Sequence, residues 1–331
     1  MATQRAVRLS DVAAVAGVSK ATASKALNDS PVVSPATKAR VREAAERLDF
    51  RPNALALSFA SGRSRTVGLL THRATATFSR PVVMGAILRL GSRERAALVF
   101  DGRIDAHRDM TESVRTLQDR RIDGLLVVGS GYARVTPSIT HHFDVPVTYA
   151  FAATDDPGDS VFLPDNEQAG YLAGRHLVEL GRTRIAHVTA DAEDLAVRRR
   201  EAGFRRALEE AGLAPVATLH GSWRREWGER AVHLLDDGPR PYDAVFCGND
   251  HIGFGMLDAL EAQGRAVPED VSVIGVDNWE EVVIDQKLRR LTTIDLDLMG
   301  VGRVAADNVI EPASHGGQKF VTPSLVRGPS T

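Results

Sequence analysis

The sequence contains almost no cysteine and no long apolar run, and both absences exclude classes of protein. Cys247 is the only cysteine among 331 residues, which excludes a disulfide framework, and no Cys/His cluster has the spacing of a zinc site. No apolar run approaches membrane-spanning length, and the first ten residues, MATQRAVRLS, lack the apolar core of a signal peptide. We therefore expect a cytoplasmic protein with no membrane partner, no metal and no other cofactor.

The motifs of several common enzyme classes are missing as well. The sequence has no GxxxxGK[ST] phosphate-binding loop, no GxSxG nucleophile turn and no HExxH zinc-binding helix. Carboxylates are plentiful, but no spaced pair stands out as a catalytic acid and its base. The sequence therefore predicts a binding protein and not an enzyme.

Charge is unevenly distributed along a chain of otherwise ordinary globular composition. A length of 331 residues suits two or three domains, and 43% hydrophobic residues can form sizeable cores. Residues 1–65 contain 11 Lys and Arg against 5 Asp and Glu, although the whole chain has a net charge of -2. A basic N-terminal segment on an acidic body indicates a protein that contacts nucleic acid with one end.

Residues 9–28, LSDVAAVAGVSKATASKALN, have the pattern of two short helices joined by a tight turn. Gly17 supplies the backbone freedom for the turn, and Ser19 is placed to cap the second helix. The two apolar faces consist of Val12, Ala13 and Ala16, and of Val18, Ala23 and Leu27. This is the pattern of a helix-turn-helix, whose second helix lies in the major groove of DNA. Ser34 and Pro35 predict the start of a third, bracing helix that runs to about Leu48.

From Arg65 onward, short apolar runs alternate with helical stretches. Such continuous β-rich runs indicate parallel strands covered by helices on both faces. The runs are TVGLL, ALVF, GLLVV, PVTYAF, RIAHVT, DAVFC and VSVIGV. They fall into two clusters, near residues 65–150 and 160–290, so we expect two similar α/β lobes. Ligands in open α/β sheets bind beyond the carboxyl ends of the strands, which directs attention to the residues just after each run.

The helix-turn-helix segment DVAAVAGVSKATASKALN is similar to the N-terminal signature of the LacI/GalR family of bacterial repressors, and the similarity continues through VSPATKARVREAAERLDFRPN at residues 33–53. The rest of the chain resembles the effector-binding core of that family. The resemblance implies a multidomain protein with an all-α headpiece and a periplasmic-binding-protein-like core of two doubly wound parallel-sheet lobes. Its expected parts are a headpiece at 1–50, a hinge helix or linker at 51–64, and an effector-binding and dimerisation core at 65–331. Within the core we expect one lobe of about 65–160 with part of 291–322, and another of about 161–290 with the C-terminal strand.

By the same resemblance, the DNA-binding residues lie on the second helix and the segments that follow it. Lys20, Ala21 and Lys25 are expected to face base edges, where lysine can reach guanine and a methyl group suits thymine. The residues expected at phosphates are Thr22, Ser24, Asn28 and Ser34, and Ser19 is also expected to contact DNA. Asn53 and Phe59 fall in the hinge segment, where Phe59 is expected to act as an apolar wedge in the minor groove. A disordered linker with a stray aromatic residue is the alternative for that segment.

The resemblance also places candidate effector-binding residues after the apolar runs. They are Thr75, Phe78, Asp101, Arg200, Trp223, Asn249 and Asp277. Arginine, asparagine and aspartate offer paired donors or acceptors for neighbouring hydroxyl groups, and an indole can cover the apolar face of a ring. Simpler roles remain open for three of them: Asp277 could cap a helix that starts at Trp279, Asn249 could cap one that starts at Asp250, and Trp223 could be core.

Two departures from the family pattern bear on the effector. Phe151 stands where an aspartate is common, and Arg73 precedes the first helix of the core, so the expected pocket is less acidic and more aromatic than in many sugar-binding relatives. A sugar is the first expectation, with a purine or an anion as the alternative. We expect a homodimer that binds a pseudo-palindromic DNA operator. A ligand receptor without DNA binding is disfavoured by the headpiece, and the C-terminus SLVRGPST lacks a leucine-heptad tail that would add a tetramer contact.

Overall fold

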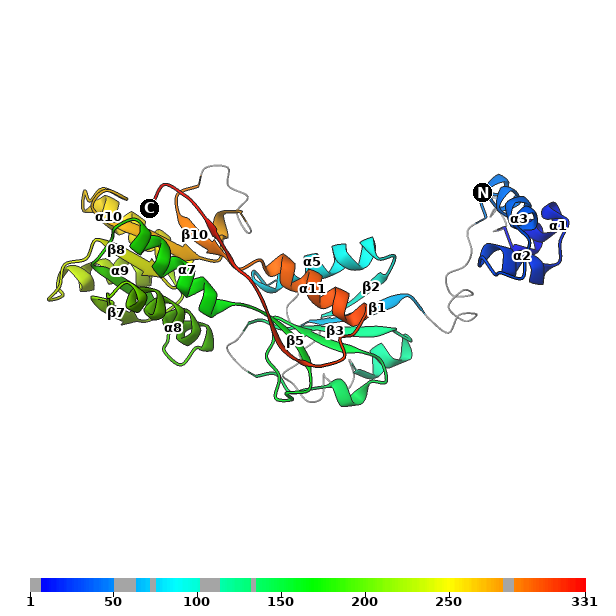
Figure 1. The fold of residues 1–331 in the computed structure, drawn as a ribbon, viewed down its shortest axis with the longest axis horizontal. Helices are drawn as coiled ribbons and strands as arrows, with labels where there is room; N and C mark the ends of the chain where they lie inside the picture. Colours follow the sequence, from blue (N-terminus) through cyan, green and yellow to red (C-terminus); the bar gives the residue numbers. More distant parts are fainter. Residues whose placement is uncertain (1–6, 51–63, 72–75, 102–113, 132–134, 282–288) are drawn as a thin grey trace, which may run out of the picture. The chain divides into compact units, whose positions relative to one another are not determined.

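The chain forms two compact units, Met1–Ser64 and Arg65–Thr331. The computed structural model describes residues 7–50, 64–71, 76–101, 114–131, 135–281 and 289–331. Figure 1 shows the three helices of the first unit in blue and the elements of the second unit from cyan to red.

The first unit is a three-helix bundle with the local signals that its sequence predicts. It consists of α1 (Leu9–Ala16), α2 (Lys20–Leu27) and α3 (Pro35–Arg47). Gly17 ends α1 in the left-handed region with φ 64°, and the Ser19 and Ser34 side chains cap α2 and α3. The buried core is made of Val12, Ala13, Ala16, Ala23, Ala26, Val33, Val41, Ala44 and Ala45. The expected helix-turn-helix and its bracing helix are confirmed.

The first sheet of the second unit is parallel throughout its described pairings. Its strands lie in the order β11-β5-β4-β3-β1-β2. The strands are β1 (Thr66–Thr71), β2 (Ala96–Asp101), β3 (Gly124–Val128), β4 (Val147–Ala150), β5 (Ser160–Pro164) and β11 (Gly317–Val321). The helices α5 (Ser79–Ser92) and α11 (Leu298–Ile310) pack side by side against it, as Figure 1 shows, and a short 3-10 turn, η1, covers Thr140–His142. Every residue of β3 and β4 is buried, as the continuous apolar runs predicted.

The second sheet has the order β12-β10-β9-β8-β6-β7 and differs from expectation at one edge. Its strands are β6 (Ile185–Thr189), β7 (Ala217–His220), β8 (Ala244–Cys247), β9 (Ser272–Val276), β10 (Thr292–Asp295) and β12 (Ser324–Val326). Its helices are α7 (Asn166–Glu179), α8 (Leu195–Glu210), α9 (Arg225–Asp236) and α10 (Asp250–Ala262). The pairing of β10 with β12 is antiparallel, because β12 returns from the first lobe in the opposite direction.

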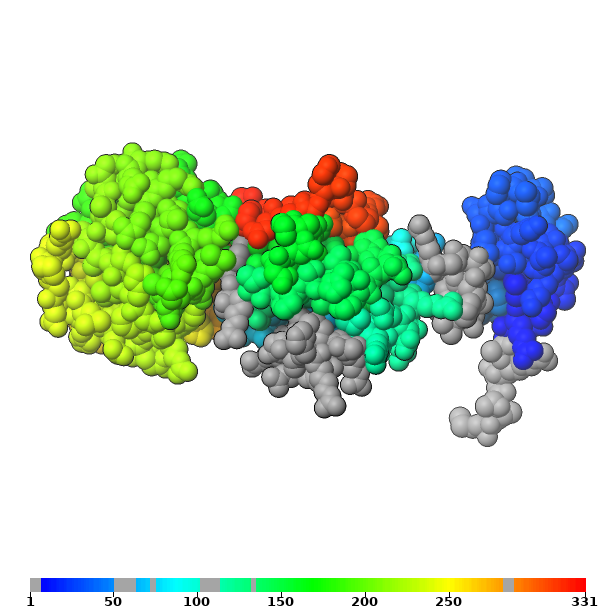
Figure 2. Space-filling model, turned by 90° about the horizontal axis from the view of Figure 1, so that it is seen from below, coloured from blue at the N-terminus to red at the C-terminus, as the bar shows by residue number. Residues whose placement is uncertain are grey.

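The chain passes between the two lobes after β5, after β10 and after β11, and these crossings place the lobe boundaries. The strand β5 pairs with β4 in the first sheet, so the first crossing lies after Pro164 and not at residue 160 as expected from the sequence. The strand β10 belongs to the second sheet, whereas α11 and β11 return to the first. Figure 2 shows the two lobes as separate masses, yellow-green for the second and teal for the first, with late residues in red on the first lobe.

Within the described ranges of the chain, no helix is both long and apolar enough to cross a membrane.

Candidate functional site

The exposed face of α2 carries the side chains that the sequence predicted for DNA contact. Lys20, Ala21 and Lys25 are exposed there, and Asn28 is exposed just beyond the helix. The Ser19 hydroxyl accepts a hydrogen bond from the Thr22 amide at 3.0 Å, so it also fixes the start of the helix. Of the remaining predicted DNA contacts, Ser24 is half-buried and Ser34 is exposed while it caps α3, whereas Asn53 and Phe59 lie outside the described residues.

A cavity of about 350 Å³ lies between the two lobes of the second unit. Its described lining consists of Phe78, Ser130, Gly131, Phe151, Pro164, Asn166, Asp194, Ala196, Arg200, Trp223, Asn249, Asp277, Leu296 and Leu298. Most of these residues follow the carboxyl ends of parallel strands, where the topology of α/β sheets places ligands. A volume of a few hundred Å³ lined by aromatic and apolar groups with a few polar ones is typical of a small-molecule site.

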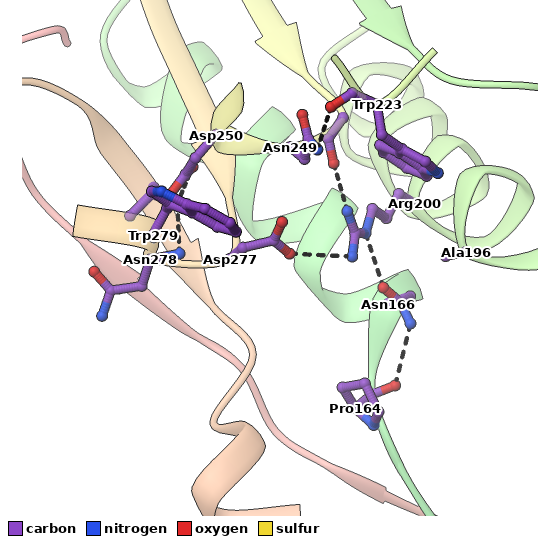
Figure 3. Close-up of polar contacts among 12 residues, drawn as sticks. Pro164, Asn166, Ala196, Arg200, Trp223, Asn249, Asp250, Asp277, Asn278 and Trp279 are labelled. Atoms are coloured by element: carbon purple, nitrogen blue, oxygen red, sulfur yellow. Dashed lines mark hydrogen bonds and ion pairs between the residues drawn. The ribbon is translucent and has the colours of Figure 1, made fainter. Parts of the chain in front are cut away.

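Arg200 is the centre of the polar side of this cavity. Its Nε donates to Asn166 Oδ1 at 2.8 Å, its Nη1 donates to the carbonyl oxygen of Gly248, and its Nη2 lies 3.5 Å from Asp277 Oδ1. Figure 3 shows these partners arranged around the guanidinium. Arg200 is only 6% exposed, so its charge depends on these partners instead of on water. The guanidinium also lies 5.5 Å from the centroid of the Trp223 ring.

Close packing of α7 against α8 brings Arg200 to Asn166. A Cβ atom on Gly170 would lie 1.9 Å from the Arg200 carbonyl oxygen, and one on Gly203 would lie 1.8 Å from the Glu167 carbonyl oxygen. Only glycine allows the two helix backbones to approach so closely. Arg198, on the same helix, is exposed and pairs with Glu193 at 2.5 Å.

Asp277 pairs with Arg200 from a constrained turn after β9. Burial raises the pKa of Asp277 to about 6, while the nearby Arg200 opposes that rise. Asp277 and Asn278 have φ values of 110° and 54°, which are costly for residues with side chains. The Trp279 amide donates to Asp250 Oδ2 at 2.7 Å, so Asp250 binds the first amide of the helix that Asp277 was suggested to cap. The Asp277 side chain points toward Arg200 (Figure 3).

Asn249 and Trp223 combine the two roles that the sequence left open. Asn249 Oδ1 accepts from the Ile252 amide at 2.9 Å and so caps α10, while the same side chain lines the cavity. Its Nδ2 donates to the Trp223 carbonyl oxygen at 3.2 Å. The Trp223 ring packs against the edge of the second-lobe core, lines the cavity, and donates from Nε1 to Asp194 Oδ2 at 3.3 Å.

Of the remaining predicted effector residues that the structure describes, one lines the cavity and one does not. Phe78 lines the cavity from the N-cap of α5, and Phe151, the departure noted in the sequence, lines it after β4 with a φ of 55°. Asp101 is exposed at the end of β2 and is not part of the described cavity lining. Thr75, like the neighbouring Arg73, lies outside the described residues.

Sequence reasoning missed Asn166 and Asp194. Asn166 is 2% exposed and begins α7 directly after the first crossing between lobes. The segment Pro164-Asp165 could have pointed to it, because Asp165 accepts from the Gln168 amide at 2.9 Å as an ordinary helix cap. Asp194 likewise caps α8, through the Ala196 amide at 2.8 Å. Both signals are caps after strands, and β5 was not among the predicted strands.

Two further hollows in the second lobe lie at the opposite, amino ends of the strands. One of 530 Å³ is lined by Arg265 and Tyr242, and one of 510 Å³ is lined by Arg289 and Arg290. Arg265, Arg289 and Arg290 are ion-paired, for example Arg265 with Asp236 at 3.0 Å. Among the residues that the structure describes, no group of three His, Cys, Asp or Glu side chains could hold a metal ion.

Comparisons with known families match both units. Residues 64–322 match the family described as periplasmic binding proteins and sugar binding domain of LacI family, and residues 8–53 match the family described as bacterial regulatory proteins, lacI family.

Comparisons with individual proteins cover nearly the whole chain. The HTH-type transcriptional repressor PurR of Vibrio parahaemolyticus serotype O3:K6 (strain RIMD 2210633) is 31% identical over 307 residues, covering 92% of this chain and 91% of that protein. PurR of Aliivibrio fischeri (strain ATCC 700601 / ES114) is 31% identical over 309 residues, covering 92% and 90%. A Lac repressor dimer bound to operator and the anti-inducer ONPF has a similar fold, with a TM-score of 0.73, 23% identity and coverage of 98% and 99%. A complex of the transcriptional regulator CelR with cellobiose has a TM-score of 0.62, 27% identity and coverage of 98% and 100%.

Proposed function

This chain belongs to the LacI family of bacterial regulatory proteins and is a DNA-binding transcription regulator, and from that premise we propose that a neutral, hydroxyl-rich small molecule controls its operator affinity. The molecule would bind in the cavity between the lobes, and a sugar is the first choice. The observation that carries this proposal is the buried polar cluster of Arg200, Asp277, Asn166 and Asn249 beside aromatic rings in one cavity.

The charge of the described lining favours a neutral ligand. It contains one guanidinium, Arg200, and two carboxyl groups, Asp277 and Asp194. Arg200 already has one protein partner at each of its three nitrogens, so two of its five N–H donors remain for a ligand. Two remaining donors beside carboxylate and amide acceptors suit neighbouring hydroxyl groups better than a phosphate, which would face both carboxyl groups.

The aromatic side chains fit the other face of such a ligand. Trp223 from the second lobe and Phe78 and Phe151 from the first lobe line the same cavity. Flat rings cover the C–H face of a sugar, while the polar cluster takes its hydroxyl edge. A purine is the second candidate, because the same rings could stack on a planar base and because two curated relatives at 31% identity are PurR repressors.

On the DNA side, we propose a homodimer whose two α2 helices read the half-sites of a pseudo-palindromic operator. The exposed Lys20, Ala21 and Lys25 would face base edges. Phe59, outside the described residues, would insert in the minor groove. Ligand would change the closure of the lobes and thereby shift the population that can bind DNA, with release of DNA as the expected direction. The regulator would act in the cytoplasm and catalyse no reaction.

The ligand is tested by thermal unfolding of the full chain against neutral sugars, sugar phosphates and purines. A compound at one hundred times its dissociation constant stabilises the folded protein by ~2.7 kcal/mol. We expect a neutral sugar to raise the unfolding temperature, and Asp277→Asn to reduce that rise. Asp236→Asn, which changes a carboxylate at another hollow of the same lobe, is the matched control and should leave the rise unchanged. A response to purines alone would favour the second candidate, and a response confined to sugar phosphates would contradict the charge argument.

The DNA function is tested with an operator selected from a random double-stranded library by the full chain. Fluorescence anisotropy then measures the affinity of wild type and of Phe59→Ala for that operator. We expect weaker binding by the variant and the same ligand-induced thermal shift, because the proposed wedge contacts only DNA. Equal operator affinity for the two proteins would reject the wedge, and a selected site without two-fold symmetry would reject the homodimer.

A further inference from the structure

The aromatic rings of Phe78 and Trp279 meet across the two lobes. Phe78 belongs to the first lobe, where it precedes α5, and Trp279 belongs to the second lobe, two residues after Asp277. Their ring centroids are 5.9 Å apart with an interplanar angle of 61°, which is a favourable edge-to-face arrangement. Phe78 lines the cavity, whereas Trp279 is not part of its described lining.

Each ring is attached to a firmly held piece of its own lobe. Next to Phe78, the buried Ser79 hydroxyl donates to the Gly129 carbonyl oxygen at 2.9 Å and ties the start of α5 to the end of β3. The Trp279 amide donates a hydrogen bond to the buried carboxyl group of Asp250 at 2.7 Å. The centroids of the Trp279 and His251 rings lie 4.1 Å apart. Because both backbones are fixed within their lobes, the distance between the two rings depends on how the lobes are placed.

The turn that carries Trp279 also carries Asp277. Asn278, between them, donates from Nδ2 to Asp295 Oδ2 at 2.9 Å and accepts at Oδ1 from Arg289 Nη1 at 2.9 Å. These bonds hold two consecutive residues at positive φ, so the turn is constrained and Asp277 and Trp279 have fixed relative positions. One rigid turn therefore presents a carboxyl group to Arg200 and an aromatic ring to Phe78.

We propose that Trp279 is a positioning residue that holds the Phe78 ring over the cavity when the lobes are closed. The proposal rests on the proposed function, because it assumes that the cavity binds a small molecule. A ligand then makes its full contact with the Phe78 ring only when the lobes are closed, because Trp279 supports that ring only in the closed conformation. Trp279 thereby couples ligand affinity to lobe closure without touching the ligand, and opening of the lobes weakens both contacts together.

The contact itself is tested without any ligand by fluorine NMR of the full chain labelled with 5-fluorotryptophan. The chain has three tryptophans, so three resonances are expected, and Trp223→Phe and Trp279→Phe assign two of them and leave Trp227 for the third. We expect Phe78→Leu to shift the Trp279 resonance. Phe320→Leu is the matched control, because Phe320 receives a cross-lobe contact from Arg199, 5.3 Å from its centroid, outside the cavity lining. A Trp279 resonance that is unchanged by Phe78→Leu, or moved equally by Phe320→Leu, overturns the proposal.

The coupling to ligand is tested by a double-mutant cycle on the dissociation constant. The probes are D-ribose, cellobiose and guanine, each measured by calorimetry if it raises the unfolding temperature. We expect Trp279→Leu to weaken binding roughly 2- to 12-fold, Trp279→Phe to restore most of the affinity, and the double variant with Phe78→Leu to bind no more weakly than Phe78→Leu alone. Losses that multiply in the double variant overturn the positioning role. If none of the probes binds, the proposed ligand class fails, and the fluorine measurement still decides whether the two rings support each other.

Discussion

Replacing Arg200 with methionine should destabilise the second unit, and more strongly at high pH than at low pH. Methionine keeps most of the length of the side chain but removes its charge and donors. The change leaves Asp277, which is 7% exposed, without the guanidinium 3.5 Å away. Removing one partner of a buried ion pair costs about 3–5 kcal/mol, because the other charge stays buried and unpaired. We expect a loss in that range at about pH 8.

The pH dependence follows from the pKa of Asp277. Burial raises this pKa from 3.8 to about 6, so the folded state binds more protons than the unfolded state between those values. The contribution of Asp277 to stability therefore falls as the pH rises from 3.8 to about 6, and it is constant above that range. Arg200 lowers the pKa of Asp277, so its removal raises that pKa further, and the decrease in stability with rising pH then continues to higher pH. The loss caused by Arg200→Met should thus be smaller at about pH 5 than at about pH 8, by ~1.4 kcal/mol for each unit of additional pKa rise.

Urea unfolding followed by circular dichroism at the two pH values measures this difference. The control is Arg205→Met on the same helix, where Arg205 is 46% exposed and pairs with Glu201 at 2.7 Å. Exposed pairs of this kind contribute about 0–1 kcal/mol, so this variant should lose little stability at either pH. Adding Asp277→Asn to Arg200→Met should recover part of the loss, because it removes the unpaired carboxylate. An equal loss at both pH values, or no recovery in the double variant, would refute the reasoning.

Three further predictions concern other parts of the chain. His187 is fully buried, and desolvation lowers its pKa from 6.5 to about 4, so the folded state binds fewer protons than the unfolded state and loses stability as the pH falls through that range. His187→Phe should remove on the order of 3 kcal/mol of the acid-induced loss of stability between about pH 7 and pH 4, as measured by urea titrations. An unchanged pH profile would contradict the burial of His187. Ser19→Ala removes the cap on the Thr22 amide and should destabilise the first unit by about 1 kcal/mol, which lowers the temperature at which its helical circular dichroism signal is lost. Ser10→Ala, which changes an exposed serine in α1, is the control. Lys25→Ala should relax base preference at one position of each half-site in a library selection, whereas an unchanged preference with weaker binding would make Lys25 a phosphate contact.

Local features of the sequence were sufficient to predict the first unit. Gly17 at positive φ, the Ser19 cap and the Ser34-Pro35 start of α3 all lie within a few residues of the structure they determine. The buried strands of the second unit were also predictable, because continuous apolar runs leave few alternatives to a covered parallel strand. The strands β5, β7, β10 and β11 carry weaker or mixed patterns, such as alternating burial in β11, and were not predicted.

The sequence by itself determined which residue types stand after each strand, and its resemblance to the LacI/GalR family selected Arg200, Trp223, Asn249 and Asp277 as candidates that the cavity brings together. Only the tertiary structure decided how they are connected. Asn166 reaches Arg200 because two glycines let α7 approach α8, and Trp279 reaches Phe78 because separate lobes meet there. Such contacts join residues 34 or more positions apart, so they depend on helix packing and lobe placement, and no short-range periodicity or capping signal encodes them.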